Sequence, residues 1–106
     1  MTKALMDWKN LTLTVDGHAN WSRKGSDIVC AGESMLVCAL AGALEEATQR
    51  GRTSSRIEMD EGKANISADP LMECSQEIKG YFRMCVTGMR MLSREYPEYI
   101  KIQEVG

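Results

Sequence analysis

The sequence is poor in several residue types that particular folds and functions need. Among its 106 residues it has one histidine, His18, and two prolines, and its four cysteines nowhere form a CxxC pair. Structural zinc sites usually draw on clustered cysteines and histidines, so this composition predicts no metal centre, and nothing in it suggests a cofactor. We expect the cysteines to be free thiols rather than a disulfide framework.

Charge and hydropathy also lack extremes. Thirteen basic and 15 acidic residues leave a net charge of −2, which predicts binding to neither nucleic acid nor membranes. The first residues, MTKALMDW, contain a lysine but not the apolar stretch of a signal peptide. The longest apolar run, residues 28–44, is interrupted by Glu33 and Ser34, whereas a membrane span needs about 18 apolar residues in a row. We therefore expect a cytoplasmic protein.

The overall composition predicts one compact domain over residues 1–106, because 43% hydrophobic and 26% charged residues are usual values for a globular chain. Alternating apolar residues predict strands at residues 2–6, 11–15 and 99–105, with Leu11, Leu13 and Val15 facing inward. The stretch at residues 55–69 predicts a hairpin that reverses through three residues, 60–62, the last of which is a glycine.

Two helices complete the expected fold. The first is expected to follow Asp27 as its N-cap, to end at Gly51 and to be buried on most sides. The second is expected to begin at Asp69-Pro70 and to run to about Tyr96, with an apolar seam at Leu71, Ile78, Phe82, Cys85, Met89 and Leu92. The resulting order, ββ-α-ββ-α-β, predicts an α+β fold whose mostly antiparallel sheet packs both helices on one face.

His18 and Cys30 form the candidate catalytic pair. Cys30 stands three residues after the expected N-cap, where free N–H groups and the helix dipole favour a thiolate and can receive an oxyanion. His18 follows a strand twelve residues earlier, and a strand–loop–helix unit can bring its imidazole beside the sulfur. On spacing alone, one cysteine and one histidine are a weak signal, and a structural cysteine with an unrelated histidine is the more common interpretation.

The neighbours of Cys30 sharpen this hypothesis. Ser34 lies one helical turn after Cys30, where its hydroxyl can bond the sulfur or orient a substrate. Asp27 can cap the helix, contact His18, or do both. Glu33 raises the pKa of a nearby thiol unless it points to solvent. Cys38 lies in mid-helix and is predicted to be structural.

Two stretches of the sequence resemble the bacterial ribosomal-processing cysteine protease (Prp) family. They are DGHANWSRKGSDIVCAGES at residues 16–34 and SREYPEYIKI at residues 93–102. The resemblance implies a small α+β homodimer that removes a short N-terminal extension from a large-subunit ribosomal protein. It assigns His18 as the catalytic histidine and Cys30 as the nucleophile, with support from the matching positions, Gly17, Asp27 and Ser34. It also implies a mobile cover at residues 19–26, in which Trp21 stacks on an aromatic substrate residue or packs against its own core.

Two departures from the family keep other functions open. Glu33 stands where a small or apolar residue is expected, and the segment before Gly17 is short. Both fit a diverged, non-catalytic peptide-binding module, or a protease for another substrate such as a phage structural protein. A redox-sensing thiol is a weaker alternative, because Cys38 lies about 12 Å along the helix from Cys30, beyond the reach of a disulfide.

Overall fold

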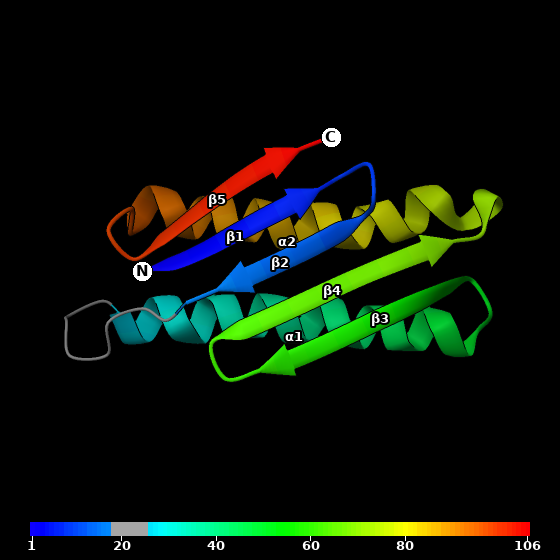
Figure 1. Cartoon of the computed structure of the whole chain (residues 1–106), viewed down its shortest axis with the longest axis horizontal. Helices are drawn as coiled ribbons and strands as arrows, with labels where there is room; N and C mark the ends of the chain where they lie inside the picture. Colours follow the sequence, from blue (N-terminus) through cyan, green and yellow to red (C-terminus); the bar gives the residue numbers. More distant parts are fainter. Residues whose placement is uncertain (18–25) are drawn as a thin grey trace.

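The computed structural model describes residues 1–17 and 26–106, and in it a five-stranded sheet lies over two helices (Figure 1). The elements follow the chain as β1 (Thr2–Asp7), β2 (Thr12–Asp16), α1 (Ser26–Gln49), β3 (Thr53–Asp60), β4 (Lys63–Pro70), a 3-10 turn η1 (Met72–Cys74), α2 (Ser75–Glu95) and β5 (Ile100–Val105). The predicted α+β fold, its element order and the placement of both helices on one face are confirmed.

The sheet has the strand order β3-β4-β2-β1-β5. The pairs β3·β4, β4·β2 and β2·β1 are antiparallel, and only the outer strand β5 runs parallel to its neighbour β1. This arrangement places the turn of the β3–β4 hairpin and the end of β2 at the same end of the molecule as the start of α1 (Figure 1). The opposite end gathers the β1–β2 turn and the start of α2 (Figure 1).

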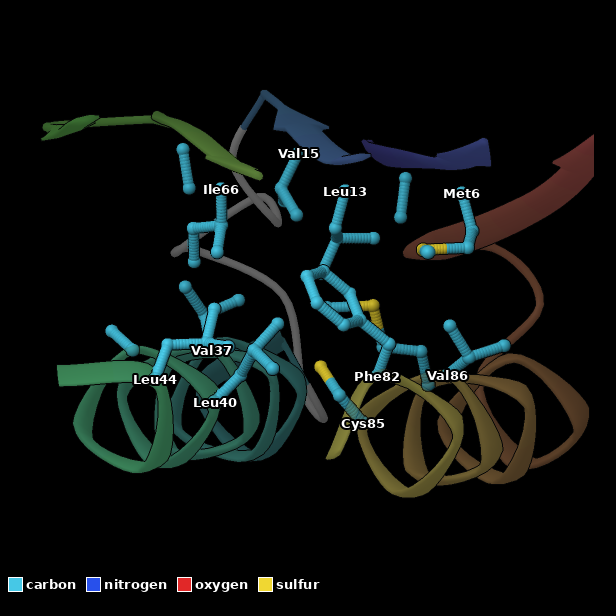
Figure 2. Packing of buried hydrophobic residues seen from close by; sticks show 14 of the residues in the cluster. Met6, Leu13, Val15, Val37, Leu40, Leu44, Ile66, Phe82, Cys85 and Val86 are labelled. Carbon is cyan, nitrogen blue, oxygen red and sulfur yellow. The ribbon is translucent and has the colours of Figure 1, made fainter. Parts of the chain in front are cut away.

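The core lies between the sheet and the helix layer (Figure 2). Leu13 and Val15 point from β2 toward the helices, as their alternation predicted, and Leu11 just before β2 is also buried. The predicted seam of α2 is buried at its central positions, Ile78, Phe82, Cys85 and Met89. Burial of each large apolar side chain stabilises the fold by about 1.5–3 kcal/mol.

Helix α1 departs from the prediction because only one of its faces is buried. Val29, Leu40 and Leu44 pack in the core, but Ile28 and Met35 are 57% and 69% exposed. By length and composition α1 is apolar enough to cross a membrane, a test that core helices also pass. Its end is as predicted, since Gly51 has a φ of +73° and closes the helix in the left-handed conformation.

The β3–β4 turn is shorter than predicted. Asp60 pairs with Lys63, so two residues, Glu61 and Gly62, reverse the chain where three were expected. Gly62 has a φ of +77°, which glycine adopts without a steric penalty.

Helix α2 begins later than predicted. Asp69 and Pro70 continue β4, where they pair with Ser54 and Thr53 of β3, and α2 starts only at Ser75. Proline at the very end of a strand is compatible with sheet pairing, so the acidic residue before it does not act as a helix cap.

Candidate functional site

Cys30 lies one turn inside α1. The helix begins at Ser26, so Asp27 belongs to the first turn rather than to the N-cap, and Cys30 lies deeper in the helix than predicted. Aspartate is favourable both at the N-cap and within the first turn, where its negative charge meets the positive end of the helix dipole, so its presence did not fix where the helix starts. The free N–H groups are therefore those of the first turn, residues 26–28. Since helical Cα–Cβ bonds tilt toward the N-terminus, the Cys30 thiol leans back over that turn.

Gly17 fixes the chain directly before His18. Its N–H donates to the carbonyl oxygen of Gly62 at 2.9 Å, and its own carbonyl accepts a hydrogen bond from Thr2 Oγ1 at 3.5 Å. Its φ is +98°, and a Cβ at this position would lie 2.5 Å from the carbonyl oxygen of Met1. Only glycine fits such a position. The exit of β2 is therefore held by β1 and by the β3–β4 turn together.

A cavity of about 280 Å³ opens between α1 and the β3–β4 turn. Its lining comes from three elements: the end of β2, one side of α1, and the hairpin tip, residues 59–64. Three of the predicted site residues, Gly17, Cys30 and Ser34, meet in this lining. Cys30 is 8% exposed, whereas Ser34 is exposed.

The hairpin tip is the part of the site that the sequence did not reveal. Met59, Asp60, Glu61 and Lys63 form the wall opposite α1. The hairpin itself was predicted, but its place beside Cys30 depends on the strand order of the whole sheet. A glycine at the turn was the only local signal, and it marks a reversal of the chain rather than a site.

Two other cysteines, Cys38 in α1 and Cys85 in α2, differ in their exposure to solvent. Cys38, predicted to be structural, is exposed and lines the same cavity as Cys30. Eight residues at about 100° each rotate a side chain by roughly 80° around the helix, which takes Cys38 off the buried face. Cys85 is buried as predicted, and burial raises the pKa of its thiol to about 11.

Carboxylates dominate the charge of this cavity. Glu33, Asp60 and Glu61 line it, with Lys63 as the one cationic lining residue among those described. Glu33 is half-buried, and its Oε2 atom is removed from solvent. The carboxylate that the sequence singled out therefore belongs to the same cavity as Cys30.

Two predicted site residues, His18 and Trp21, lie outside the described residues, and Asp27 is described only by its helical backbone. Among the residues that the structure describes, no cluster of histidine, cysteine and carboxylate side chains could hold a metal ion. The described part of the site thus offers a thiol, a hydroxyl, carboxylates and the free N–H groups of a helix start.

Residues 1–101 match the family model described as cysteine protease Prp. The fold is similar to that of the ribosomal processing protease Prp of Staphylococcus aureus, solved with a substrate peptide (TM-score 0.75, 21% identity, covering 98% of this chain and 99% of that one). The same protease with a covalently linked product peptide gives a TM-score of 0.75 at 22% identity, with 98% and 99% covered.

A protein of Streptococcus mutans is also similar in fold, with a TM-score of 0.68 at 19% identity over 98% of this chain and 91% of that one. At these identities the structural likeness shows the fold. The comparison with curated proteins gives no match. Because the family model spans nearly the whole sequence, the chain belongs to the cysteine protease Prp family and is a cysteine protease.

Proposed function

We propose that this protein is an endopeptidase that removes a short N-terminal extension from a large-subunit ribosomal protein, with Cys30 as nucleophile and His18 as general base and acid. It acts in the cytoplasm as a single domain, residues 1–106. The observation that carries the proposal is the position of Cys30 in the cavity beside Gly17, from which the chain continues into His18. Membership of the Prp family and the substrate-bound Staphylococcus aureus relative support the choice of substrate.

The proposed reaction needs no group beyond the chain and water. The Cys30 thiolate attacks the scissile carbonyl, forming a C–S bond, and the free N–H groups of the first turn of α1 receive the oxyanion. The His18 imidazolium gives its proton to the leaving amine as the C–N bond breaks. A water, deprotonated by His18, then attacks the thioester and releases the carboxylic acid as the C–S bond breaks.

The other predicted residues assist in this scheme. Asp27 supports the start of α1 and the orientation of His18, and the Ser34 hydroxyl orients the substrate or bonds the sulfur. Trp21 contacts an aromatic residue of the substrate. Each of these roles changes substrate binding or the orientation of the dyad rather than supplying the nucleophile, so each variant should retain a measurable rate.

The test is to incubate the protein with the host's ribosomal protein precursor and to read the new N-terminus by mass spectrometry. Cys30→Ala is expected to lower the rate by at least about a thousandfold. Cys38→Ala is the matched control, since Cys38 lies on the same helix and the same cavity, and it is expected to retain most of kcat. Equal rates for Cys30→Ala and the parent protein would refute the proposal.

A second candidate function is a non-catalytic peptide-binding module, and the observation that favours it is Glu33 in the lining of the Cys30 cavity. A binder retains peptide affinity but reacts slowly with alkylating agents. A protease shows a thiol that is alkylated well below pH 8, and this reactivity disappears in Cys30→Ser. Cleavage of a phage structural protein in place of the ribosomal precursor would instead identify a protease with another substrate.

We also propose that two copies associate through the outer surface of the helix layer. Between the helices lies a small groove of about 150 Å³, lined by Leu36, Ala39, Leu40, Ala43, Gly80, Tyr81, Met84 and Cys85. Met35, Met84 and Met91 are 69%, 77% and 60% exposed, and apolar surface of this kind often marks an interface.

Sedimentation velocity tests this association. Met84→Glu places a charge in the groove and is expected to yield monomers, whereas Met72→Glu, at a methionine that is 91% exposed outside the groove, should leave the dimer intact. A parent protein that stays monomeric at micromolar concentration would contradict the proposed dimer.

A further inference from the structure

A second cavity, of about 860 Å³, lies at the end of the molecule opposite Cys30. It is formed by the β1–β2 turn (residues 8–11), the end of β4, the first turns of α2 and Gly106 after β5. In Figure 1 these segments gather on the right, whereas α1 begins on the left. The Cα atoms extend 44 Å along the long axis, so this cavity is remote from the proposed protease site.

Three cationic side chains line this cavity: Lys9 from the turn, and Lys79 and Arg83 from α2. Lys79 and Arg83 stand four residues apart on one face of the helix, where like charges repel each other. None of the three forms an ion pair among the described residues, whereas Arg50, Arg52, Arg56 and Arg90 each pair with a glutamate. The fold thus brings together cations whose mutual repulsion a bound anion would relieve.

Two carboxylates nearby, Asp69 and Asp7, offset part of this charge. Asp69 is the one acidic side chain in the described lining. Asp7 is the last residue of β1 and directly precedes the turn. Its Oδ1 atom accepts hydrogen bonds from the N–H groups of Lys9 and Asn10, and its Oδ2 atom accepts one from Asn10 Nδ2. These bonds, with that from the Asn10 side chain first, hold the pKa of Asp7 below its usual value. Asp7 therefore orders the turn that presents Lys9.

The turn also supplies an aromatic ring in a fixed position. Trp8 Nε1 donates a hydrogen bond to Glu104 Oε1 at 2.9 Å, and the other Glu104 oxygen pairs with Arg90 at 3.0 Å. Leu11 closes the turn with a φ of +46°, the only positive value at a non-glycine residue in the described chain. Residues other than glycine rarely adopt this backbone conformation. The surrounding structure holds it and keeps Trp8 and Lys9 at the cavity.

We propose that this cavity binds a ligand that combines a nucleobase with phosphate, as an RNA strand or a free nucleotide does. Lys79, Arg83 and Lys9 take the phosphate oxygens, and the base stacks on the indole of Trp8, the combination that nucleic-acid-binding grooves use. The near-neutral composition hides this site, because three cationic side chains and one acidic side chain line it among the described residues, whereas three acidic side chains line the Cys30 cavity. The site does not depend on the proposed protease activity.

The test measures binding of fluorescein-labelled octauridylate by fluorescence anisotropy, with uridine monophosphate as a competitor. Saturable binding is expected, and the logarithm of the association constant should fall with the logarithm of salt concentration by about 0.7 for each phosphate contacted. Arg83→Gln is expected to weaken binding about tenfold, the loss of a charge-assisted contact. Arg94→Gln, on the same helix but outside the cavity, is the matched control and should bind like the parent.

A second measurement uses Trp21→Phe, in which Trp8 is the only remaining tryptophan, and follows quenching of its emission by the same ligands. Efficient competition by uridine monophosphate identifies a free nucleotide, and binding of octauridylate alone identifies a strand. Absence of saturable binding of both probes at 50 mM salt overturns the proposal. Equal weakening by Arg83→Gln and Arg94→Gln also overturns it, because it indicates diffuse attraction. Unchanged binding by Cys30→Ala separates this site from proteolysis.

Discussion

Two cavities at opposite ends of the molecule differ in the sign of most charged side chains in their described linings. At the Cys30 end, Glu33, Asp60 and Glu61 surround a cavity of about 280 Å³ with Lys63 as its one described cation. At the far end, Lys9, Lys79 and Arg83 line a cavity of about 860 Å³ with Asp69 as its one described acidic side chain. A net charge of −2 therefore describes neither lining, because folding brings like charges together from separate parts of the sequence.

Strand β2 joins the two ends and is flanked by a residue of positive φ at each of them: Leu11 at +46° and Gly17 at +98°. Leu11 is 5% exposed, so its burial in the core offsets the cost of an unfavourable backbone conformation. A side chain at position 17 could not gain such burial, because its Cβ would lie 2.5 Å from the carbonyl oxygen of Met1. The position at Leu11 tolerates a side chain, and the position at Gly17, in the Cys30 cavity, does not.

Among the variants that test this comparison, Gly17→Ala is expected to have the largest effect. The methyl group meets the Met1 carbonyl, so the end of β2 must move, and the segment that begins at His18 moves with it. We expect a loss of about 2 kcal/mol in the free energy of unfolding and a fall in kcat/KM of at least about a hundredfold. Urea denaturation and the precursor cleavage assay measure the two quantities.

Gly42→Ala is the control for Gly17→Ala, because a Cβ at Gly42 meets no atom within 4 Å. In an exposed helix, alanine should stabilise the protein by about 0.5–1 kcal/mol. If Gly17→Ala cleaved the precursor at the parental rate, the backbone at Gly17 would not matter for the proposed role of His18.

Glu33→Gln tests how a carboxylate in the Cys30 cavity affects the reactivity of Cys30. Both side chains line this cavity, and a carboxylate repels the anionic form of a thiol, so the rate of Cys30 alkylation at pH 7 should rise several-fold in this variant. Alkylation with iodoacetamide at pH 7, followed by peptide mass spectrometry, gives the rate for each cysteine. An unchanged rate for Cys30 would mean that the charge of Glu33 does not act on the thiol.

A smaller effect is expected from neutralising the hairpin tip with Asp60→Asn and Glu61→Gln. Carboxylates around a cavity raise the local concentration of cationic substrates. The double variant should therefore lower kcat/KM about threefold for a substrate peptide with lysine after the cleavage site, but not for the same peptide with glutamine. Equal effects on both peptides would show that the tip acts by shape rather than by charge.

The smallest effect concerns a polar cluster at the far end. Arg52 Nη1 donates to both carboxylate oxygens of Glu77 at 3.0 and 2.9 Å, and the Tyr81 hydroxyl donates to Glu77 Oε2. The hydrogen bond from Tyr81, and after it those from Arg52, hold the pKa of Glu77 below its usual value. The hydrogen bond to Glu77 raises the pKa of Tyr81 above its usual value. A carboxyl group whose pKa is lower in the folded protein than in the unfolded chain stabilises the fold at pH values above its pKa in the unfolded chain. This stabilisation is lost as the pH falls through the lower pKa of the folded protein.

Thermal unfolding between pH 2.5 and 7 tests this linkage. The acid-side fall in Tm should be shallower in Glu77→Gln than in the parent protein. Glu46→Gln is the control, because Glu46 forms an exposed pair with Arg50 that contributes little. Identical acid-side slopes in Glu77→Gln and the parent would contradict the assignment.

Local patterns predicted much of the fold. The inward positions of β2, the seam of α2 and the end of α1 at Gly51 follow from periods of 2 and 3.6 residues and from the conformational freedom of glycine. The start of α2 was misplaced because Asp69-Pro70 suits both a helix start and a strand end, and pairing with β3 decided between them. The extent of burial of α1 could not be read from its composition, since its exposed face is also apolar.

The candidate site was predictable only in part. Cys30 and Ser34 are one turn apart, so any helix through them places both on one side, and Gly17 was marked by its place in the family motif. The wall formed by Asp60, Glu61 and Lys63 depends on the sheet order β3-β4-β2, which no local pattern encodes. The exposure of Cys38 depends on which face of α1 meets the sheet.

The central claim, that Cys30 is the nucleophile of a peptide-cleaving site, is tested most directly by a chloromethyl ketone built on the precursor's cleavage sequence. After incubation with the intact protein, mass spectrometry should find one inhibitor per chain, attached to the peptide that contains Cys30, and much slower labelling in His18→Ala. A label on Cys38, or labelling of Cys30 at an equal rate in His18→Ala, would contradict it.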